Sequence, residues 1–342
     1  MALTRRSVIT ASIVLLCLGL GEFWFQAANR LGYYVNQPLL GGKPLADLCD
    51  GNDTTGFPFR LKLSCNKLTL PLRVGDGVFY LDAKEAQGSA SLFSPNHVLL
   101  TLSSPIVVRK ADGSPFATLR HDGMTLDAVW GLAGLRQIRL DAAALDWRPE
   151  SPAAGVAVNI QKLKASAGPQ GDPDAPSSLR FDLSGDGITA PALQALLNGA
   201  GAGHFALSGT IAPAPRLGED WRAALEEWRR KPGSLTIQTM EWRAGDVFLR
   251  IDGALAIDDA HRIAGRLNLA AQDAGALLVR FGVPSSSVQT QNLLGALLGQ
   301  GAGAKENANK GDAKALRLPL TLANGQIFVG PFRLPQKLQP LY

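Results

Sequence analysis

Residues 247–269 read VFLRIDGALAIDDAHRIAGRLNL, and apolar and polar side chains alternate through both halves of this stretch. Alternation with a period of two gives a β-strand one apolar and one polar face. The turn-forming residues 258–261 separate the halves, and strands joined by so short a turn pair antiparallel. The stretch therefore predicts a half-buried antiparallel hairpin. Its apolar positions are Val247, Leu249, Ile251, Leu255, Ile257, Ile263, Leu267 and Leu269.

The same alternation recurs on both sides of this hairpin. It runs through residues 57–65, 98–102, 124–128 and 135–140, with Gly, Pro, Asp or Asn between the runs. Near the end of the chain, residues 316–322 alternate and lead through Asn324-Gly325, a dipeptide typical of hairpin turns, into a last strand. We therefore predict a mainly β protein with a few short helices. Its long, curved antiparallel meander forms either an open groove or a closed two-layer sandwich.

Composition supports a folded chain of many short elements. Of the 342 residues, 46% are hydrophobic and 18% are charged, which excludes intrinsic disorder as the main state. The 37 Gly and 21 Pro residues interrupt the chain too often for a helical bundle or a coiled coil. The net charge of +5 is not concentrated in any run, so we expect no nucleic acid partner.

The N-terminal residues predict a membrane anchor. Residues 7–25 are largely apolar, with Glu22 as their only charged residue, and Arg5 and Arg6 precede them. As a helix this stretch spans about 28 Å, roughly one hydrocarbon core. Retained positive charge places the N-terminus in the cytoplasm, so we expect a single-pass inner-membrane protein whose bulk is periplasmic. A cleaved signal peptide, which begins in the same way, is the alternative.

Two cysteines agree with export. Cys49 and Cys65 are separated by 15 residues rich in turn formers, and a disulfide closing such a loop contributes about 3 kcal/mol in an oxidising compartment. Two reduced, buried thiols are the alternative. The four histidines show no spacing that joins them to a cysteine or to one another, so we expect no metal site and no cofactor.

The sequence predicts one amphipathic helix. From Glu219 or Asp220 to Arg230, the residues Trp221, Leu225 and Trp228 share one face, and Pro232-Gly233 closes the segment. The helix either lies on the sheet or lies on a membrane surface with its basic residues towards lipid headgroups. The membrane-surface candidates are Trp221, Trp228, Arg229 and Arg230.

Linker-like composition divides the chain. Residues 167–178 hold three prolines and two glycines among polar residues, and residues 299–315 are rich in Gly, Ala, Asn and Lys. Residues 190–198, 275–281 and 291–298 show a less regular helical pattern, and we predict short covering helices there. The predicted organisation is 1–34 as cytoplasmic stub, anchor and interface, 35–168 as an N-terminal β unit, and 169–342 as a C-terminal β unit with a flexible loop at 299–315.

No stretch carries a recognisable catalytic or phosphate-binding motif. The glycine-rich residues 199–203 precede a strand rather than open a helix, and residues 299–305 lack the Gly-Lys-Ser/Thr ending of a phosphate loop. The chain also has no Gly-x-Ser-x-Gly elbow. We therefore expect a protein that is not an enzyme and has no catalytic residues.

The cysteine-bracketed stretch carries a family resemblance. Its core, Gly56-Phe57-Pro58-Phe59-Arg60, resembles the signature of a bacterial envelope family called domain of unknown function 2125. Residues 242–269 and 316–334 are similar to the corresponding parts of that family. The resemblance implies an envelope protein and carries over no catalytic residue. More distantly, the anchor and extended sheet resemble AsmA-like envelope proteins, which implies a long groove for acyl chains.

An apolar sheet face with few helices to cover it suits hydrocarbon better than a sugar or nucleotide. Burying an acyl chain contributes about 0.8 kcal/mol per methylene, so no charged clamp is needed. We therefore expect an inner-membrane protein that binds or passes phospholipid or another acyl lipid. The alternative is an envelope adaptor that docks a protein partner through its sheet edges or the Trp221 helix. The groove candidates are Phe57, Phe59, Leu61, Leu63, Val247, Leu249, Ile251, Leu255, Ile257, Leu267, Leu269, Leu318 and Leu320.

Overall fold

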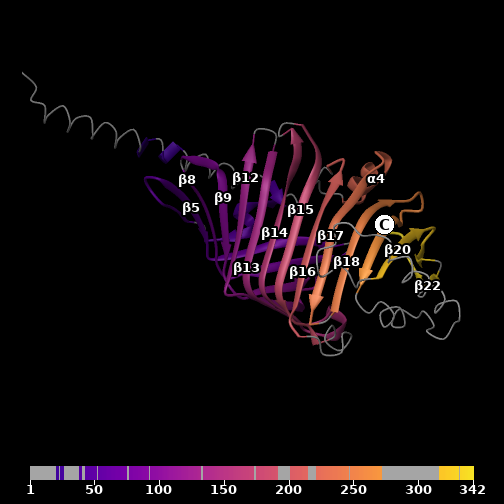
Figure 1. Ribbon diagram of the computed structural model, residues 1–342. Coiled ribbons are helices and arrows are strands. Elements are labelled where there is room, and N and C mark those ends of the chain that lie inside the picture. The colour runs from indigo at the N-terminus through magenta and orange to yellow at the C-terminus, as the bar shows by residue number, and fades with distance from the viewer. Residues whose placement is uncertain are drawn as a thin grey trace, which may run out of the picture. The chain divides into compact units, whose positions relative to one another are not determined.

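The computed structural model shows a mainly β protein with few helices, as predicted (Figure 1). Twenty strands form one antiparallel sheet that is open rather than closed, and β1 (Pro38–Leu40) pairs with β2 (Lys43–Pro44) in a second, two-stranded sheet. The chain divides into two units, residues 1–162 and 163–342. The structure describes residues 21–22, 24–26, 38–40, 43–51, 53–74, 77–91, 93–131, 134–172, 175–191, 201–214, 221–245, 247–271, 316–330 and 332–342.

The N-terminal unit is a succession of antiparallel hairpins that follow the short helix α2 (Leu45–Leu48). Its strands are β3 (Cys49–Asp50), β4 (Asp53–Thr55), β5 (Arg60–Cys65), β6 (Lys67–Val74), β7 (Gly77–Ala83), β8 (Ala86–Ser91), β9 (Ser94–Leu102), β10 (Ile106–Lys110), β11 (Pro115–Arg120), β12 (Gly123–Gly131) and β13 (Gly134–Pro149), and a 3-10 turn η1 (Pro152–Ala154) follows them.

The long hairpins of this unit are interrupted at matching positions. Strand β5 pairs with β8, and β6 pairs with β7. The break between β5 and β6, at residues 65–67, therefore lies opposite the break between β7 and β8, at residues 83–86. The next strands break at 103–105 and 121–122, and β13 changes partner from β12 to β11 around Ala144, whose φ is +49°. Hydrogen bonds bridge the breaks, for example from Ser103 N to Glu85 O at 2.9 Å.

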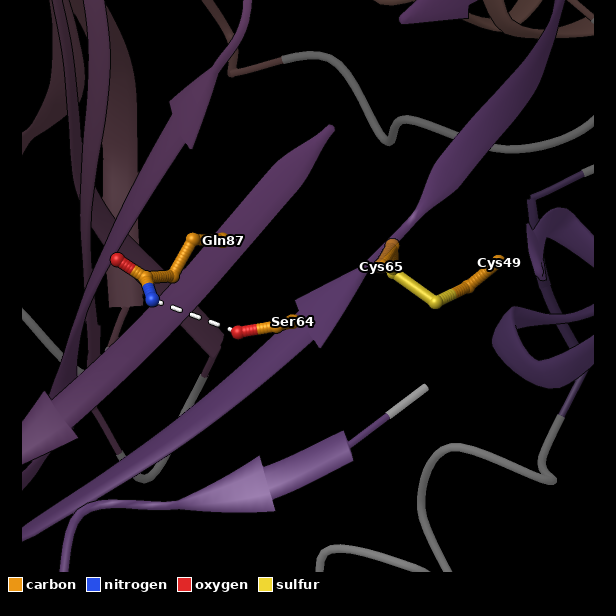
Figure 2. Close-up of a disulfide and its surroundings, with 4 residues drawn as sticks. All are labelled: Cys49, Ser64, Cys65 and Gln87. Atoms are coloured by element: carbon orange, nitrogen blue, oxygen red, sulfur yellow. Dashed lines mark hydrogen bonds between the residues drawn. A yellow bond between two sulfur atoms is a disulfide. The ribbon is translucent and has the colours of Figure 1, made fainter. Parts of the chain in front are cut away.

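The core of the N-terminal unit lies along these strand breaks. Leu68, Ala83, Ala86 and Ile106 are each at most 5% exposed and pack with both cysteines. The predicted disulfide is present: Cys49 and Cys65 are bonded, with their Cα atoms 5.3 Å apart (Figure 2). Beside it, Gln87 on β8 donates a hydrogen bond to Ser64 on β5. The bridge therefore ties the start of the first hairpin to the core.

The C-terminal unit is a meander in which each strand pairs with the next. Strands β16, β17 and β18 lie side by side (Figure 1). The turn at Asn324-Gly325 joins β20 to β21 as predicted, with positive φ at both residues. The elements are β14 (Val158–Asp172), which contains the division between the units, β15 (Ala175–Ile188), β16 (Gly203–Ala212), α4 (Trp221–Arg230), β17 (Ser234–Ala244), β18 (Val247–Ile257), β19 (Ile263–Ala271), β20 (Leu316–Ala323), β21 (Gln326–Val329) and β22 (Phe332–Lys337).

Two local predictions were wrong. The described residues of 167–178 are not a flexible linker, because β14 extends to Asp172 and β15 begins at Ala175. The first predicted strand begins at Arg60 and not at Phe57, because residues 57–59 form a turn closed by a hydrogen bond from Arg60 N to Gly56 O. The predicted loop at 299–315 and the predicted helices at 275–281 and 291–298 lie outside the described residues, as does nearly all of the one at 190–198.

The predicted membrane anchor lies mostly outside the described residues. Within the part of the chain that the structure describes, no helix is both long enough and apolar enough to span a bilayer. Residues 24–26 at the end of the apolar stretch are described and helical.

Candidate functional site

The meander of the C-terminal unit aligns its apolar side chains into rows that cross the strands. Successive antiparallel partners follow one another from β15 to β21, so that each row continues without a change of face. We call the surface formed by these rows the apolar face. Its rows are Leu179, Ile211, Leu235, Leu255, Gly265, Leu322 and Ile327; Phe181, Gly209, Ile237, Gly253, Leu267, Leu320 and Val329; Leu183, Leu207, Met240, Ile251, Leu269 and Leu318; and Gly185, Phe205, Trp242, Leu249 and Ala271.

The opposite face of the same strands carries polar and charged pairs. Asn268 on β19 donates to Asp252 on β18 at 2.9 Å, and Arg180 pairs with Asp182 along β15 at 3.2 Å. The two faces therefore differ as the sequence alternation predicted.

Two glycines of β16 make room for large aromatic side chains on the neighbouring strands. A Cβ atom at Gly209 would lie 2.7 Å from the ring of Phe181, and one at Gly203 would lie 2.4 Å from the ring of Trp242. Both distances are too short for a contact, so any larger residue at Gly203 or Gly209 would collide with these aromatic rings.

Helix α4 covers part of the first row. Trp228 is 8% exposed, and its indole nitrogen donates to the carbonyl oxygen of Pro213 at 3.1 Å. Between the helix and the sheet lies a cavity of about 250 Å³ with only apolar side chains around it. Its lining residues are Ile211, Leu225, Trp228, Leu235, Leu255, Ala256, Ile257, Ile263 and Leu341.

An ionic network fixes the helix over this cavity. Glu226 accepts two hydrogen bonds from Arg229, at 2.8 and 2.9 Å, and one from Arg230 at 2.8 Å. The Tyr342 hydroxyl donates to the same carboxylate at 3.0 Å. The Tyr342 ring also lies 4.6 Å from the ring of His261, in the turn between β18 and β19. The helix, this turn and the last residues of the chain therefore meet at one carboxylate.

The charge balance of this network favours the ionised carboxylate. The hydrogen bonds from Arg229, then those from Tyr342 and Arg230, hold the pKa of Glu226 well below its usual range, although partial burial opposes the shift. The same pairing raises the pKa of Arg229. Burial and the bond to Glu226 raise the pKa of Tyr342, so its hydroxyl keeps its proton and acts as the donor.

The structure brings the C-terminal groove candidates together on the apolar face. Within it, Leu267 and Leu318 are buried, whereas Ile251 is half-buried. The candidates that share this face are Val247, Leu249, Ile251, Leu255, Ile257, Leu267, Leu269, Leu318 and Leu320.

The four remaining groove candidates belong to the N-terminal unit. Leu61 and Leu63 lie on β5, opposite Ala90 and Gly88, and are half-buried. Phe57 and Phe59 lie in the turn before β5 and are 57% and 51% exposed. Placing these two phenylalanines within the first strand was therefore incorrect, because the strand starts after them.

The contacts of the membrane-surface candidates on α4 differ from those expected of a helix that lies on lipid headgroups. Trp228 is turned towards the sheet, and Arg229 and Arg230 pair with Glu226. Of the two interpretations of the helix, these contacts agree with the one that lays it on the sheet. The side chain of Trp221 is outside the described residues.

Sequence reasoning missed two features of this site. Tyr342 lies 116 residues from Glu226 along the chain, and no local pattern links them. The indole nitrogen of Trp242, in the fourth row, is buried and has no hydrogen-bond partner among the described residues. The unsatisfied nitrogen is the type of group that an alternation pattern never reveals. Within the same residues, no three His, Cys, Asp or Glu side chains cluster as metal ligands.

Comparison with known proteins gives one match. A family model described as "Uncharacterized protein conserved in bacteria (DUF2125)" matches residues 48–336, which include the disulfide, the Gly56–Arg60 motif and the apolar face. Searches of the curated proteins and of the solved structures found no match. Because the family model covers most of the chain, the protein belongs to the DUF2125 family.

Proposed function

We propose that this protein is an anchored, periplasmic envelope protein that binds or passes lipid acyl chains on the apolar face. The observation that carries the proposal is the continuity of the rows across seven strands, β15 to β21. With strands about 4.8 Å apart, six steps give a track of about 29 Å. The hydrocarbon core of a bilayer, about 30 Å, is two acyl chains thick, so the track is long enough to hold one acyl chain along its length.

The cover over the apolar face supports a ligand that needs few polar contacts. Among the described residues, α4 lies over part of the first row, and the cavity beneath it is apolar. Phe181, Leu207 and Ile251, in the rows beyond, are half-buried. Each methylene that moves from water to this face contributes about 0.8 kcal/mol, so a dozen carbons give about 10 kcal/mol before the cost of ordering the chain.

The proposal is tested by extracting the purified, folded full-length protein with organic solvent and identifying the lipid by mass spectrometry. We expect lipid in a fixed ratio to protein. A lysine at Ile251 would be buried against the acyl chain, and its desolvation costs more than about 1.4 kcal/mol, so Ile251→Lys reduces bound lipid at least tenfold.

The matched control is Ala254→Lys, which adds the same charge to the exposed, opposite face of the same strand, β18. We expect this variant to keep the wild-type amount of lipid. A stable, folded preparation without lipid would contradict the proposal and favour the adaptor function. Equal lipid in the two lysine variants would show that the lipid is not held on the apolar face.

A further inference from the structure

The exposed aromatic residues of the N-terminal unit gather at one end of its strands. Phe57 and Phe59 lie between β4 and β5, and Phe93, which is 76% exposed, lies between β8 and β9. Trp130, at the end of β12, is 42% exposed. We call Phe57, Phe59, Phe93 and Trp130 the aromatic end.

Strand register and contacts place these residues next to one another. Arg60, which follows Phe59, is opposite Ser91, and the rings of Phe59 and Phe93 stack with centroids 5.9 Å apart. The side chain of Asn96 on β9 donates to the carbonyl oxygen of Trp130 at 3.1 Å. Three neighbouring hairpin ends therefore carry the aromatic end.

The hairpin between β10 and β11, at the opposite end of the strands, is polar. It reads Ala111-Asp112-Gly113-Ser114, and Asp112 accepts hydrogen bonds from the backbone and hydroxyl of Ser114. The unit therefore has one end suited to water and one end with exposed aromatic rings. Clusters of exposed rings are unusual on a water-facing surface and are typical of the boundary between lipid and water.

The end of the apolar N-terminal stretch contacts the aromatic end. Trp24, near the end of residues 7–25, packs edge-on against Phe57 with ring centroids 5.8 Å apart. Its indole nitrogen donates to the carbonyl oxygen of Arg60 at 2.9 Å. A bilayer that contains the apolar stretch therefore has its surface at the level of these hairpin ends.

We infer that the aromatic end inserts into the headgroup region of the bilayer in which residues 7–25 are anchored. The inference rests on the proposed membrane anchor. Phe93 and Trp130 bury their rings among the outermost methylenes, and the exposed Arg60 at the same end lies at the depth of the lipid phosphates. The strands of the N-terminal unit then begin at the membrane surface, and the polar hairpin is held away from it.

The test places a fluorescent probe at each end of the unit. Full-length Phe93→Trp and Leu72→Trp are reconstituted into phosphatidylethanolamine and phosphatidylglycerol vesicles, with and without lipids brominated in the acyl chains. Leu72 is the matched control because it is 46% exposed and lies towards the polar hairpin, through its pairing with Phe79 and that of Phe79 with Lys110. The signal of each probe is the tryptophan emission of the variant minus that of wild type. We expect brominated lipid to reduce this signal about twofold or more for Phe93→Trp and to leave it unchanged for Leu72→Trp.

A third sample separates this inference from the anchor. The difference in tryptophan emission between wild type and Trp24→Phe is the emission of Trp24, so its loss in brominated lipid reports quenching at the end of residues 7–25. Quenching of Trp24 without quenching of the Phe93→Trp probe would overturn the inference and leave the anchor in place, whereas no quenching of either would overturn the anchor itself. Shielding of the Phe93→Trp probe from iodide without quenching by brominated lipid would assign the aromatic end to a protein partner and would also overturn the inference.

Discussion

His121 is the buried side chain that fits its surroundings least well. It lies at the strand break between β11 and β12 and is 7% exposed, and neither ring nitrogen makes a hydrogen bond of normal geometry with the described residues. Burial lowers the pKa of His121 below its usual 6.5, although the charge of Asp122 and the backbone of Ser103 oppose the shift. The folded protein therefore favours the neutral ring.

Replacing this imidazole with a ring of similar size is expected to stabilise the protein. His121→Phe removes two poorly satisfied polar atoms, so the free energy of unfolding rises by about 1 kcal/mol in denaturant titrations at pH 7. The wild type loses stability as the pH falls below 6.5, because the unfolded chain binds the proton more readily, and the variant lacks this loss. If wild type and His121→Phe lost stability equally as the pH fell, the lowered pKa of His121 would be contradicted.

The disulfide gives a second prediction at the scale of single residues. Replacing both Cys49 and Cys65 with Ser frees a closed loop with a sequence separation of 16, which costs about 3 kcal/mol of unfolding free energy. The measurement is denaturant unfolding of the full chain. The control is Cys17→Ser, which changes the remaining cysteine, and we expect it to unfold as the wild type does. On a non-reducing gel, Cys49→Ser should remove any mobility change caused by reductant.

At the scale of elements, α4 depends on its carboxylate network. Glu226 has its pKa below the ordinary value of 4.5, so its contribution is complete above that value and is lost as the pH falls below it. We expect Glu226→Gln to unfold at a lower temperature than wild type at pH 7 and to show little further loss between about pH 5 and about pH 3. Thermal melts followed by tryptophan fluorescence measure this, because Trp228 is a buried residue of the helix itself.

Two further variants make the interpretation specific. Tyr342→Phe keeps the ring next to His261 and removes the hydroxyl that donates to Glu226, so we expect a smaller change in the same direction. Glu241→Gln removes a carboxylate on β17 that pairs with Arg243 instead. If Glu241→Gln altered the acid sensitivity as much as Glu226→Gln did, the network at α4 would not be its source.

Elements with a strong pattern could be predicted from the sequence, and elements with a weak one could not. The hairpin of β18 and β19 and the helix α4 follow from the spacing of large apolar side chains such as Ile251 and Trp228. The strand residues within 167–178 were missed because most of them are Gly, Pro, Ser or Ala, which local preference assigns to a linker. Their strands, β14 and β15, are extended because they lie inside the sheet, between β13 and β16.

The site could be predicted only in part for a similar reason. Alternation identifies which side chains share a face, so the members of the apolar face on β18 to β20 were found. The aromatic end depends on which hairpin ends are neighbours, and the sequence around Phe93 or Trp130 carries no information on that pairing. The contact of Tyr342 with Glu226 is equally non-local.

For the whole molecule, the rows that cross the C-terminal strands have a geometric consequence. Each row gains about 10 Å for every hairpin added, because two strands are added at about 4.8 Å each. The length of the apolar face across the strands is therefore set by the number of hairpins, and its side chains are apolar along the whole length. We therefore expect that adding or removing one hairpin of the meander would lengthen or shorten the apolar face by about 10 Å without changing its apolar character.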